Sequence, residues 1–182
     1  MPIAINLRVG EHDTAAFRKL QDEAAALLSL PSLHDLGYWP HVTLAVYDDI
    51  ESHVVHAAAA LLFSGAAPVE LEFAAVRFFE GPVLTLYAAP SPSPELENLA
   101  RKLHRLISPE RCHPHYRPGS FVPHCTLAMN ISPDRHDEVF DFARRKRIHL
   151  RATLTGGEIA SFPPPRVEAS FPLAGAARLP TG

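Results

Sequence analysis

Two stretches of this chain place a histidine and a threonine two residues apart. Both read Pro-His-x-Thr-Leu-Ala, and they span residues 40–45 and 123–128. Alternate side chains of an extended strand lie on the same face, so we expect His41 beside Thr43 and His124 beside Thr126. An imidazole can take up or release a proton near neutral pH, and a hydroxyl can donate a hydrogen bond to an anionic oxygen. Each stretch therefore offers groups suited to acid-base chemistry.

Each motif should also have an apolar back and an open end. In the first motif, Val42 and Leu44 are expected on the face opposite the histidine, where they can pack into a core. The next positions on the polar face are expected to be Ala45 and Ala128, because each follows its threonine by two residues. Their small side chains would leave room for a ligand beside each histidine and threonine.

A phosphate group held between the two motifs would use all of these groups. One neutral histidine could accept a proton from water or a hydroxyl, while the other, protonated, donated one to the leaving oxygen. The threonine hydroxyls could donate to the non-bridging oxygens, on which negative charge develops. This chemistry requires no metal ion and no cofactor. The candidates for catalysis are therefore His41, Thr43, His124 and Thr126.

Length and composition indicate an ordinary folded protein. The 182 residues are 47% apolar and 20% charged, as in typical globular domains, and we expect a single domain over residues 1–182 that consists of two repeated lobes. The first residues alternate as a strand and do not resemble a signal peptide, and no uncharged run is long enough to span a membrane. We expect a cytoplasmic monomer without a membrane partner.

The cysteines and the net charge restrict the function further. Cys112 and Cys125 cannot form a disulfide framework, so we expect reduced thiols. A net charge of -3 is not typical of a protein that binds long nucleic acid through a broad basic surface. A short ligand that carries a phosphate is compatible with this charge.

The expected order of elements repeats along the chain. Hydrophobic periodicity and capping signals predict strand, helix, loop, motif strand, helix and strand for residues 3–79, and the same order for residues 83 to about 160. Two such units, each with one sheet face unburied, favour two lobes with a cleft between them. Pseudo-twofold symmetry would then bring the two motifs together.

Capping residues and turns predict particular boundaries. Asp13 with Thr14 is expected to cap the first helix, and Ser93 is expected to cap the helix that begins with Pro94. The motif strands are expected at residues 41–47 and 122–130. The last three strands are expected at residues 148–155, 157–162 and 166–173.

Two His-x-Thr motifs about eighty residues apart, in a chain of about 180, resemble the two-histidine (2H) phosphoesterase superfamily. Within it, the chain is similar to the bacterial group named 2'-5' RNA ligase or RNA 2',3'-cyclic phosphodiesterase. The resemblance implies an α+β, bilobal fold with two pseudo-symmetric antiparallel sheets, outer helices and a central cleft. It also implies metal-independent chemistry on 2',3'-cyclic phosphate ends of RNA or small cyclic nucleotides, which would be the partners. By this resemblance, His124 is the base that activates water and His41 is the acid.

Residues just before each motif are candidates for substrate binding. Arg117 could make paired hydrogen bonds with a phosphate, and Tyr116 could stack on a base, although both also suit an ordinary surface loop. Tyr38 and Trp39 occupy the corresponding place before the first motif. Trp39 is expected to be either a platform for a base or an anchor in the core.

Three alternatives to a hydrolase without metal remain open. The same cleft could hold an RNA end or a phosphorylated metabolite without turning it over, or it could join RNA ends as a 2'-5' RNA ligase. The third alternative is a metal hydrolase that uses the loop from Cys112 to His115. This loop contains ligand types that zinc uses, but the usual zinc spacings are absent. We therefore predict no metal site.

Overall fold

The structure is a computed structural model that describes residues 1–174, which form an α+β fold of seven strands and four α-helices. This confirms the fold class expected from the sequence. The strands are β1 (Ile3–Val9), β2 (His41–Tyr47), β3 (Val69–Phe79), β4 (Leu84–Pro90), β5 (Cys125–Ile131), β6 (Leu150–Ser161) and β7 (Arg166–Pro172). The helices are α1 (Glu11–Leu28), α2 (Ser52–Ser64), α3 (Pro94–Leu106) and α4 (His136–Arg145).

The strands form one continuous antiparallel sheet in the order β2-β1-β6-β3-β4-β5, with β7 paired to β6. The two sheets that we expected are the two halves of this sheet, joined where β3 pairs with β6. Each repeat contributes its third strand to the other half, because β3 pairs with β4 and β6 pairs with β1. A pseudo-twofold relation therefore matches β1 with β4, β2 with β5, and β3 with β6.

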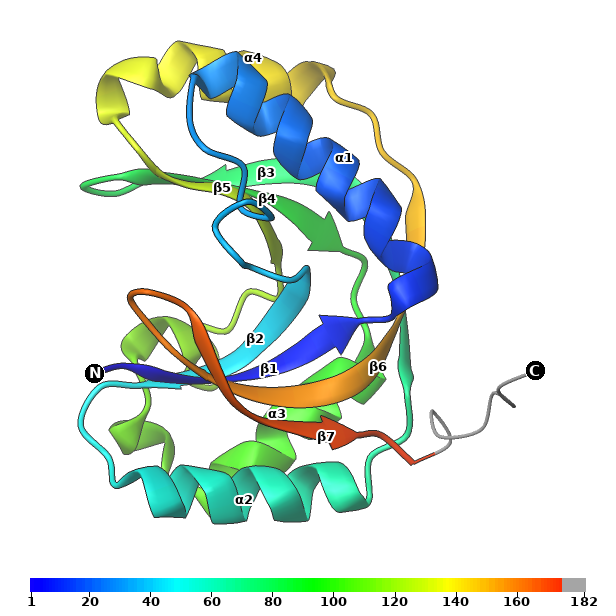
Figure 1. The fold of residues 1–182 in the computed structure, drawn as a ribbon, viewed down its shortest axis with the longest axis vertical. Coiled ribbons are helices and arrows are strands. Elements are labelled where there is room, and N and C mark those ends of the chain that lie inside the picture. The colour runs from blue at the N-terminus through cyan, green and yellow to red at the C-terminus, as the bar shows by residue number, and fades with distance from the viewer. Residues whose placement is uncertain (175–182) are drawn as a thin grey trace.

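The helices cover the outer side of each half. Helices α1 and α4 pack on the half that contains β3, β4 and β5, whereas α2 and α3 pack on the half that contains β1, β2 and β6. Figure 1 shows these pairs above and below the strands. The T-shaped contact of Phe17 on α1 with Phe73 on β3, at 4.9 Å between ring centroids, is part of this packing.

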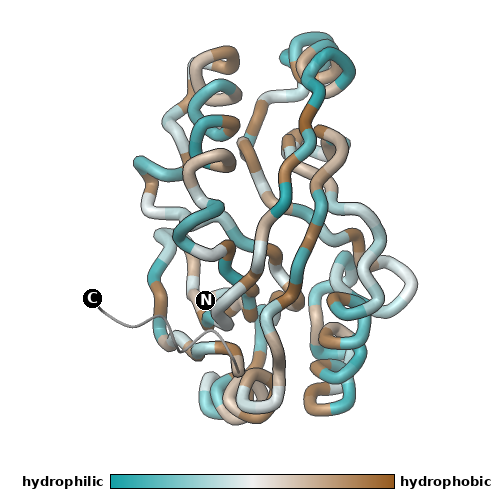
Figure 2. The backbone as a smooth tube through the Cα atoms, turned by 90° about the vertical axis from the view of Figure 1, so that its right-hand side faces the viewer, coloured by the Kyte–Doolittle hydropathy of each residue, from teal (hydrophilic) through white to brown (hydrophobic). Residues whose placement is uncertain are grey.

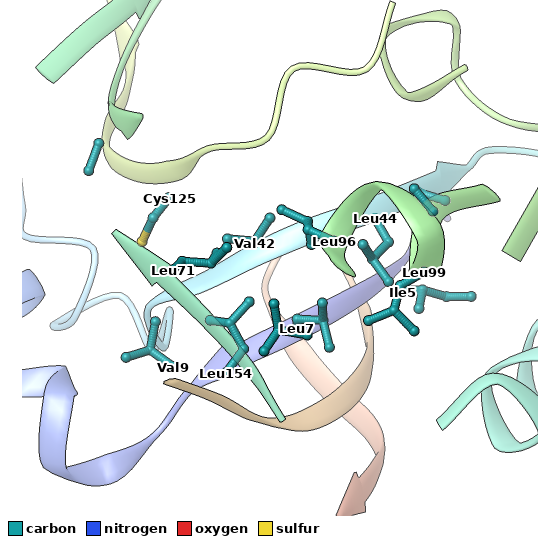
Figure 3. Close-up of a cluster of buried hydrophobic side chains, with 14 of the residues drawn as sticks. Ile5, Leu7, Val9, Val42, Leu44, Leu71, Leu96, Leu99, Cys125 and Leu154 are labelled. Carbon is teal, nitrogen blue, oxygen red and sulfur yellow. The ribbon is translucent and has the colours of Figure 1, made fainter. Parts of the chain in front are cut away.

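The core lies between the sheet and these helices. Hydrophobic and hydrophilic residues alternate along the chain in Figure 2, as expected for elements with one packed face. Val42 and Leu44 are fully buried, which confirms the apolar back of the first motif. Figure 3 shows both side chains in one buried cluster with Cys125 of the second motif.

The expected boundaries of the late strands and of the first helix were wrong. The strands expected at 148–155 and 157–162 are one strand, β6, which pairs first with β3 and then with β1 and β7. Helix α1 begins at Glu11, before Asp13, whose carboxylate instead accepts a hydrogen bond from the backbone N–H of Thr153 at 2.8 Å. A long-range hydrogen bond therefore uses the side chain that was expected to cap the helix.

The expected start of the third helix was correct. Ser93 accepts a hydrogen bond from the backbone N–H of Leu96 at 3.2 Å, and Pro94 occupies the first turn. The second motif strand begins at Cys125, three residues later than expected, so His124 lies just before β5. Within residues 1–174, no helix has the length and apolar character that crossing a membrane requires.

Gly157 on β6 lets helix α2 pack directly on the strand. A Cβ atom at this position would overlap the ring of Phe63, whereas the nearest atom to a Cβ at Gly156 is the carbonyl oxygen of Phe171 at 3.6 Å. Phe63 is fully buried, so its ring has little space to move away.

We predict that Gly157→Ala lowers the free energy of unfolding. The same substitution at the neighbouring residue, Gly156→Ala, should lower it much less. Overpacking a buried site typically costs about 1–3 kcal/mol. Urea denaturation of the two variants measures the difference in free energy of unfolding. Equal stability of the two variants would contradict the view that a side chain at position 157 overlaps the ring of Phe63.

Candidate active site

The two motif strands meet in the middle of the molecule. Cys125, the central residue of the second motif, is fully buried. Burial raises the pKa of its thiol to about 12, and a hydrogen bond to the backbone of His41 acts in the opposite direction. The backs of the two motifs are therefore in contact, although β2 and β5 lie at opposite ends of the strand order.

Both motif strands carry a β-bulge directly after the threonine. In the first half, Thr43 lies opposite Asn6 but Ala45 lies opposite Ile5, so Leu44 is an extra residue. This shift turns Ala45 into the core, where it is fully buried, and Val46 lines the cleft in its place. Ala45 was expected on the polar face, and the bulge is the reason that this expectation was wrong.

The second half repeats this bulge. Thr126 lies opposite Tyr87 and Ala128 lies opposite Leu86, which leaves Leu127 as the extra residue. Ala128 is buried, contrary to expectation, and Met129 lines the cleft. The pseudo-symmetry thus extends to the irregularity that shapes the site.

Each motif histidine is held by a carbonyl two residues before it. The Nδ1 atom of His41 lies 2.5 Å from the carbonyl oxygen of Trp39, and Nδ1 of His124 lies 2.8 Å from that of Val122. A carbonyl can only accept a hydrogen bond, so in the neutral rings the proton lies on Nδ1. Nε2 is then the atom of each ring that can exchange protons with a ligand.

A cavity of about 180 Å³ opens beside the motifs. His41, Thr43 and Thr126 line it. His124 does not line the cavity. Its ring centroid lies 6.5 Å from that of Tyr116, and Tyr116 does line the cavity. Three of the four predicted catalytic residues therefore share one cavity, and the fourth lies next to its wall.

Aromatic rings surround His124. Its ring centroid lies 5.0 Å from that of Phe79 and 5.4 Å from that of Tyr87, both in edge-on contacts. Burial lowers the pKa of His124 below the ordinary 6.5; the hydrogen bond to Val122 opposes this shift, and the charge of nearby His41 adds to it. The lowered pKa favours the neutral form of His124.

Polar residues surround the first motif. The hydroxyl of Thr43 donates a hydrogen bond to the side-chain oxygen of Asn6 at 2.9 Å. Arg8 lies opposite His41 across the strand pair, and its Nε atom is 3.7 Å from a carboxylate oxygen of the buried Glu158. The second motif thus has aromatic rings around its histidine, whereas the first motif has polar groups around it.

The two tyrosines predicted for substrate binding both line the cavity. Burial raises the pKa of Tyr116 to about 12, Cys112 raises it further, and a hydrogen bond with Thr43 acts in the opposite direction. Burial also raises the pKa of Tyr38. Both phenols are therefore protonated at neutral pH and can act as hydrogen-bond donors.

Arg117 and Trp39 both donate hydrogen bonds to backbone carbonyls, but only Trp39 lines the cavity. Arg117 does not line the cavity, because its guanidinium donates hydrogen bonds to the carbonyl oxygens of Cys112 and Glu110 at 2.9 and 3.1 Å. Trp39 lines the cavity, and its Nε1 atom donates to the carbonyl oxygen of Val9 at 2.8 Å. Arg117 thus holds its own loop, and the ring of Trp39 is anchored to β1.

The loop considered as a zinc site has its rings stacked on each other. The ring centroids of His113 and His115 are 5.0 Å apart with nearly parallel planes. Among residues 1–174 there is no group of three or more His, Cys, Asp or Glu side chains that could hold a metal ion.

Sequence reasoning missed several residues of the cleft. Asn6 and Glu158 lie opposite each other on β1 and β6 and line the cavity, as do Gln21 on α1 and Arg166 on β7. A signal for Asn6 was present, because it interrupts an otherwise apolar strand at a position that alternates with Ile5 and Leu7. The other three could be placed only from the fold.

The chain matches the family described as the 2'-5' RNA ligase superfamily over residues 33–160. This match extends over more than half of the sequence, so the chain belongs to the 2'-5' RNA ligase superfamily. The family comprises phosphoesterases and enzymes of the RNA ligase type, and the chain is an enzyme of this class. Among proteins with curated descriptions, none matches the chain.

Solved structures show the same fold at low sequence identity. TT0787 of Thermus thermophilus has a TM-score of 0.66 and 20% identity, over 95% of this chain and 98% of that one. E. coli LigT complexed with 3'-AMP has a TM-score of 0.56 and 18% identity, over 96% of this chain and 97% of that one. E. coli LigT complexed with NADP+ has a TM-score of 0.57 and 17% identity, over 94% of each chain.

We predict that the His124 imidazole titrates below pH 6.5 and that Phe79→Ala raises its pKa toward that value. Removing the ring lets water reach the imidazole and so reduces the cost of charging it. Phe78→Ala is the matched control, because Phe78 contacts His136 and not His124. Titration of the imidazole signals by NMR measures both effects. A His124 pKa above 6.5 in the unaltered protein would contradict this description of the site.

Proposed function

We propose that the protein is a phosphodiesterase that needs no metal and hydrolyses 2',3'-cyclic phosphate ends of RNA or small cyclic nucleotides. The observation that carries this proposal is the matched pair of histidines, each with Nδ1 held by the carbonyl two residues earlier. Two imidazoles oriented in the same way leave two Nε2 atoms for one reacting group. Such a pair can supply general acid-base catalysis at a phosphate ester, one imidazole as the base and the other as the acid.

His124 is the base in this mechanism. Its pKa is lowered by burial, so it is neutral and can accept a proton at Nε2 from the attacking water. The oxygen of that water forms a bond to phosphorus as the bond to the 2' or 3' oxygen breaks. His41, which lies among polar groups, acts as the acid and donates a proton from Nε2 to the leaving oxygen. One water is consumed, and the product is a phosphomonoester.

The threonines bind the non-bridging oxygens of the phosphate. The hydroxyl of Thr126 lines the cavity at the second motif. That of Thr43 donates to Asn6 in this structure, and a phosphate oxygen replaces the amide oxygen as its acceptor when substrate binds. Charge on these oxygens increases in the transition state, so both hydrogen bonds strengthen there.

The substrate carries a nucleoside. Tyr116 and Tyr38 line the cavity with apolar ring surface and a protonated hydroxyl each, which suits a base and a ribose. The fold is that of E. coli LigT, which was crystallised with 3'-AMP and with phosphate. In our proposal residues 1–182 act as one domain and one monomer, and Tyr116 and Tyr38 take the binding role that Arg117 was expected to share.

Ligation of RNA ends through a 2'-5' linkage is the second candidate. The match to the 2'-5' RNA ligase superfamily favours it. The two histidines would keep their roles, and the 5' hydroxyl of a second RNA would attack the cyclic phosphate in place of water. The bond to the 3' oxygen would break, which leaves a 2'-5' linkage and a free 3' hydroxyl. A ligase must hold two RNA ends, whereas a hydrolase holds one. Formation of a joined product from an RNA with a cyclic phosphate end therefore distinguishes ligation from hydrolysis.

We predict that His41→Ala and His124→Ala each lower the turnover of adenosine 2',3'-cyclic phosphate by about 10²- to 10⁴-fold. The matched control is His53→Ala, because His53 is an exposed histidine on α2 outside the cavity. Initial rates by chromatography, with and without a chelator, measure the effect. Full activity in either variant, or loss of activity in chelator with recovery in zinc, would contradict the mechanism. Binding of the cyclic nucleotide without any turnover would indicate a binding module instead.

We predict a bell-shaped dependence of kcat/KM on pH whose acidic limb lies below pH 6.5. The base must be neutral and its pKa is lowered, so on the acidic side activity is retained until the pH falls through this lowered value. On the basic side, activity is lost when the acid gives up its proton. The two apparent pKa values belong to the coupled pair of histidines. Rates measured between pH 4.5 and 9 test this. An acidic limb centred above pH 6.5 would exclude His124 as the base.

A further inference from the structure

Two guanidinium groups lie over the ring of Trp39. The Cζ atom of Arg8 on β1 is 4.4 Å from the ring centroid, and that of Arg18 on α1 is 4.8 Å from it. Both distances are within the range of a cation–π contact. The ring that was expected to hold a base or anchor a core is therefore occupied by two cations.

These two cations have few acceptors around them. Arg8 has one ion pair, at 3.7 Å from the buried Glu158, which is longer than a hydrogen bond. The Nε atoms of Arg8 and Arg18 are buried and make no hydrogen bond within residues 1–174. Holding two like charges at one ring costs free energy unless an anion lies close to both. An anionic group bound next to Arg8, Trp39 and Arg18 would therefore stabilise this cluster.

This cluster adjoins the catalytic motif directly. Arg8 is the cross-strand neighbour of His41, and the carbonyl of Trp39 holds Nδ1 of the same histidine. Trp39 lines both the catalytic cavity and a second, open cavity of about 570 Å³, which Arg18 also lines. A ligand in the catalytic cavity can thus extend past Trp39 toward Arg18.

Both signs of charge face the second cavity. Lys19 lines it together with Glu11 and Asp22. The Asp22 carboxylate already accepts a hydrogen bond from Ser32 at 2.6 Å and lies 3.6 Å from His34. Glu11 is in the first turn of α1, where the helix dipole favours a negative charge. Neither carboxylate is paired with Arg18 in these contacts, so the guanidinium remains available to a ligand.

We infer that Arg8, Trp39 and Arg18 form a binding site for a second phosphate group of the substrate. This inference rests on the proposed function, because it places the second phosphate next to the one that reacts at His41. Arginine suits the task, since its planar donors pair with phosphate oxygens while its face stays on an aromatic ring. On β4, Ala88 pairs with Cys125 as Leu7 on β1 pairs with Val42, so the next residue, Ala89, corresponds to Arg8. The pseudo-symmetric half therefore has no arginine at this position. The site therefore gives the substrate a direction across the cleft.

The second phosphate has two chemical sources. It is either the free 5'-phosphate of a mononucleotide or the next phosphodiester of an RNA strand. Three ligands that cannot be hydrolysed at a cyclic phosphate separate these sources: 3'-AMP, adenosine 3',5'-bisphosphate and the dinucleotide ApAp. Trp39 is the only tryptophan of the chain, so its fluorescence reports binding at this ring without any need for turnover.

We predict that the protein binds the bisphosphate or the dinucleotide about tenfold more tightly than 3'-AMP, and that Arg18→Gln abolishes this difference. Arg101→Gln is the matched control, because it removes the same charge from an exposed site on α3 and should retain the difference. Tighter binding of the bisphosphate alone identifies a free 5'-phosphate, and tighter binding of the dinucleotide alone identifies an RNA strand. If Arg18→Gln fails to fold, Arg18→Lys takes its place and should lose most of the difference, because it lacks the planar donors.

Equal affinity for all three ligands in the unaltered protein would overturn the inference, as would a difference that survives in Arg18→Gln. Failure of the proposed function has another signature. In that case adenosine 2',3'-cyclic phosphate is not hydrolysed by the unaltered protein, whatever the fluorescence titrations give.

Discussion

The pairing of β3 with β6 is the constraint on which the rest of the structure depends. Each of these strands belongs to one repeat in the sequence and to the other half in space, and their pairing joins the halves into one sheet. The motif strands β2 and β5 then lie at the two ends of the strand order, yet they contact each other. The sheet must therefore curve until its ends meet, and the cavity with the two motifs lies on the inner side of that curve. Without this exchange of strands, two separate lobes could move apart and the two motifs would not be held next to each other.

The two halves present the same motif in different surroundings. The residue opposite the threonine is Asn6 in the half with the first motif and Tyr87 in the half with the second. In the half with Tyr87, the ring of Phe79 also contacts His124. Burial among rings keeps an imidazole neutral, whereas polar neighbours tolerate its charge. A symmetric framework with unequal neighbours is how two identical groups can take opposite roles, one as base and one as acid.

Much of this could be predicted from the sequence. The repeated order of elements indicated two lobes with a cleft, and the family resemblance of the two motifs implied the α+β class. Ser93 with Pro94 located a helix start. These signals are local, since a strand period or a cap depends on neighbouring residues. The bulges after Thr43 and Thr126 could not be predicted, because alternation assumes a regular strand and the extra residue is visible only in the pairing register. Arg117 and Trp39 were placed by proximity to the motifs along the chain. The guanidinium of Arg117 instead binds carbonyls of its own loop, and Trp39 contacts the distant carbonyl of Val9 and the side chains of Arg8 and Arg18.

The central claim is that both motif histidines serve one phosphate. Titration of the protein with inorganic phosphate, followed through the imidazole ¹⁵N signals of His41 and His124, tests it most directly. The account predicts that Nε2 of both rings shifts together with a single dissociation constant, while the Nδ1 signals, held by the carbonyls of Trp39 and Val122, change little. Shifts confined to one histidine, or two different dissociation constants, would contradict the claim that the two motifs form one site.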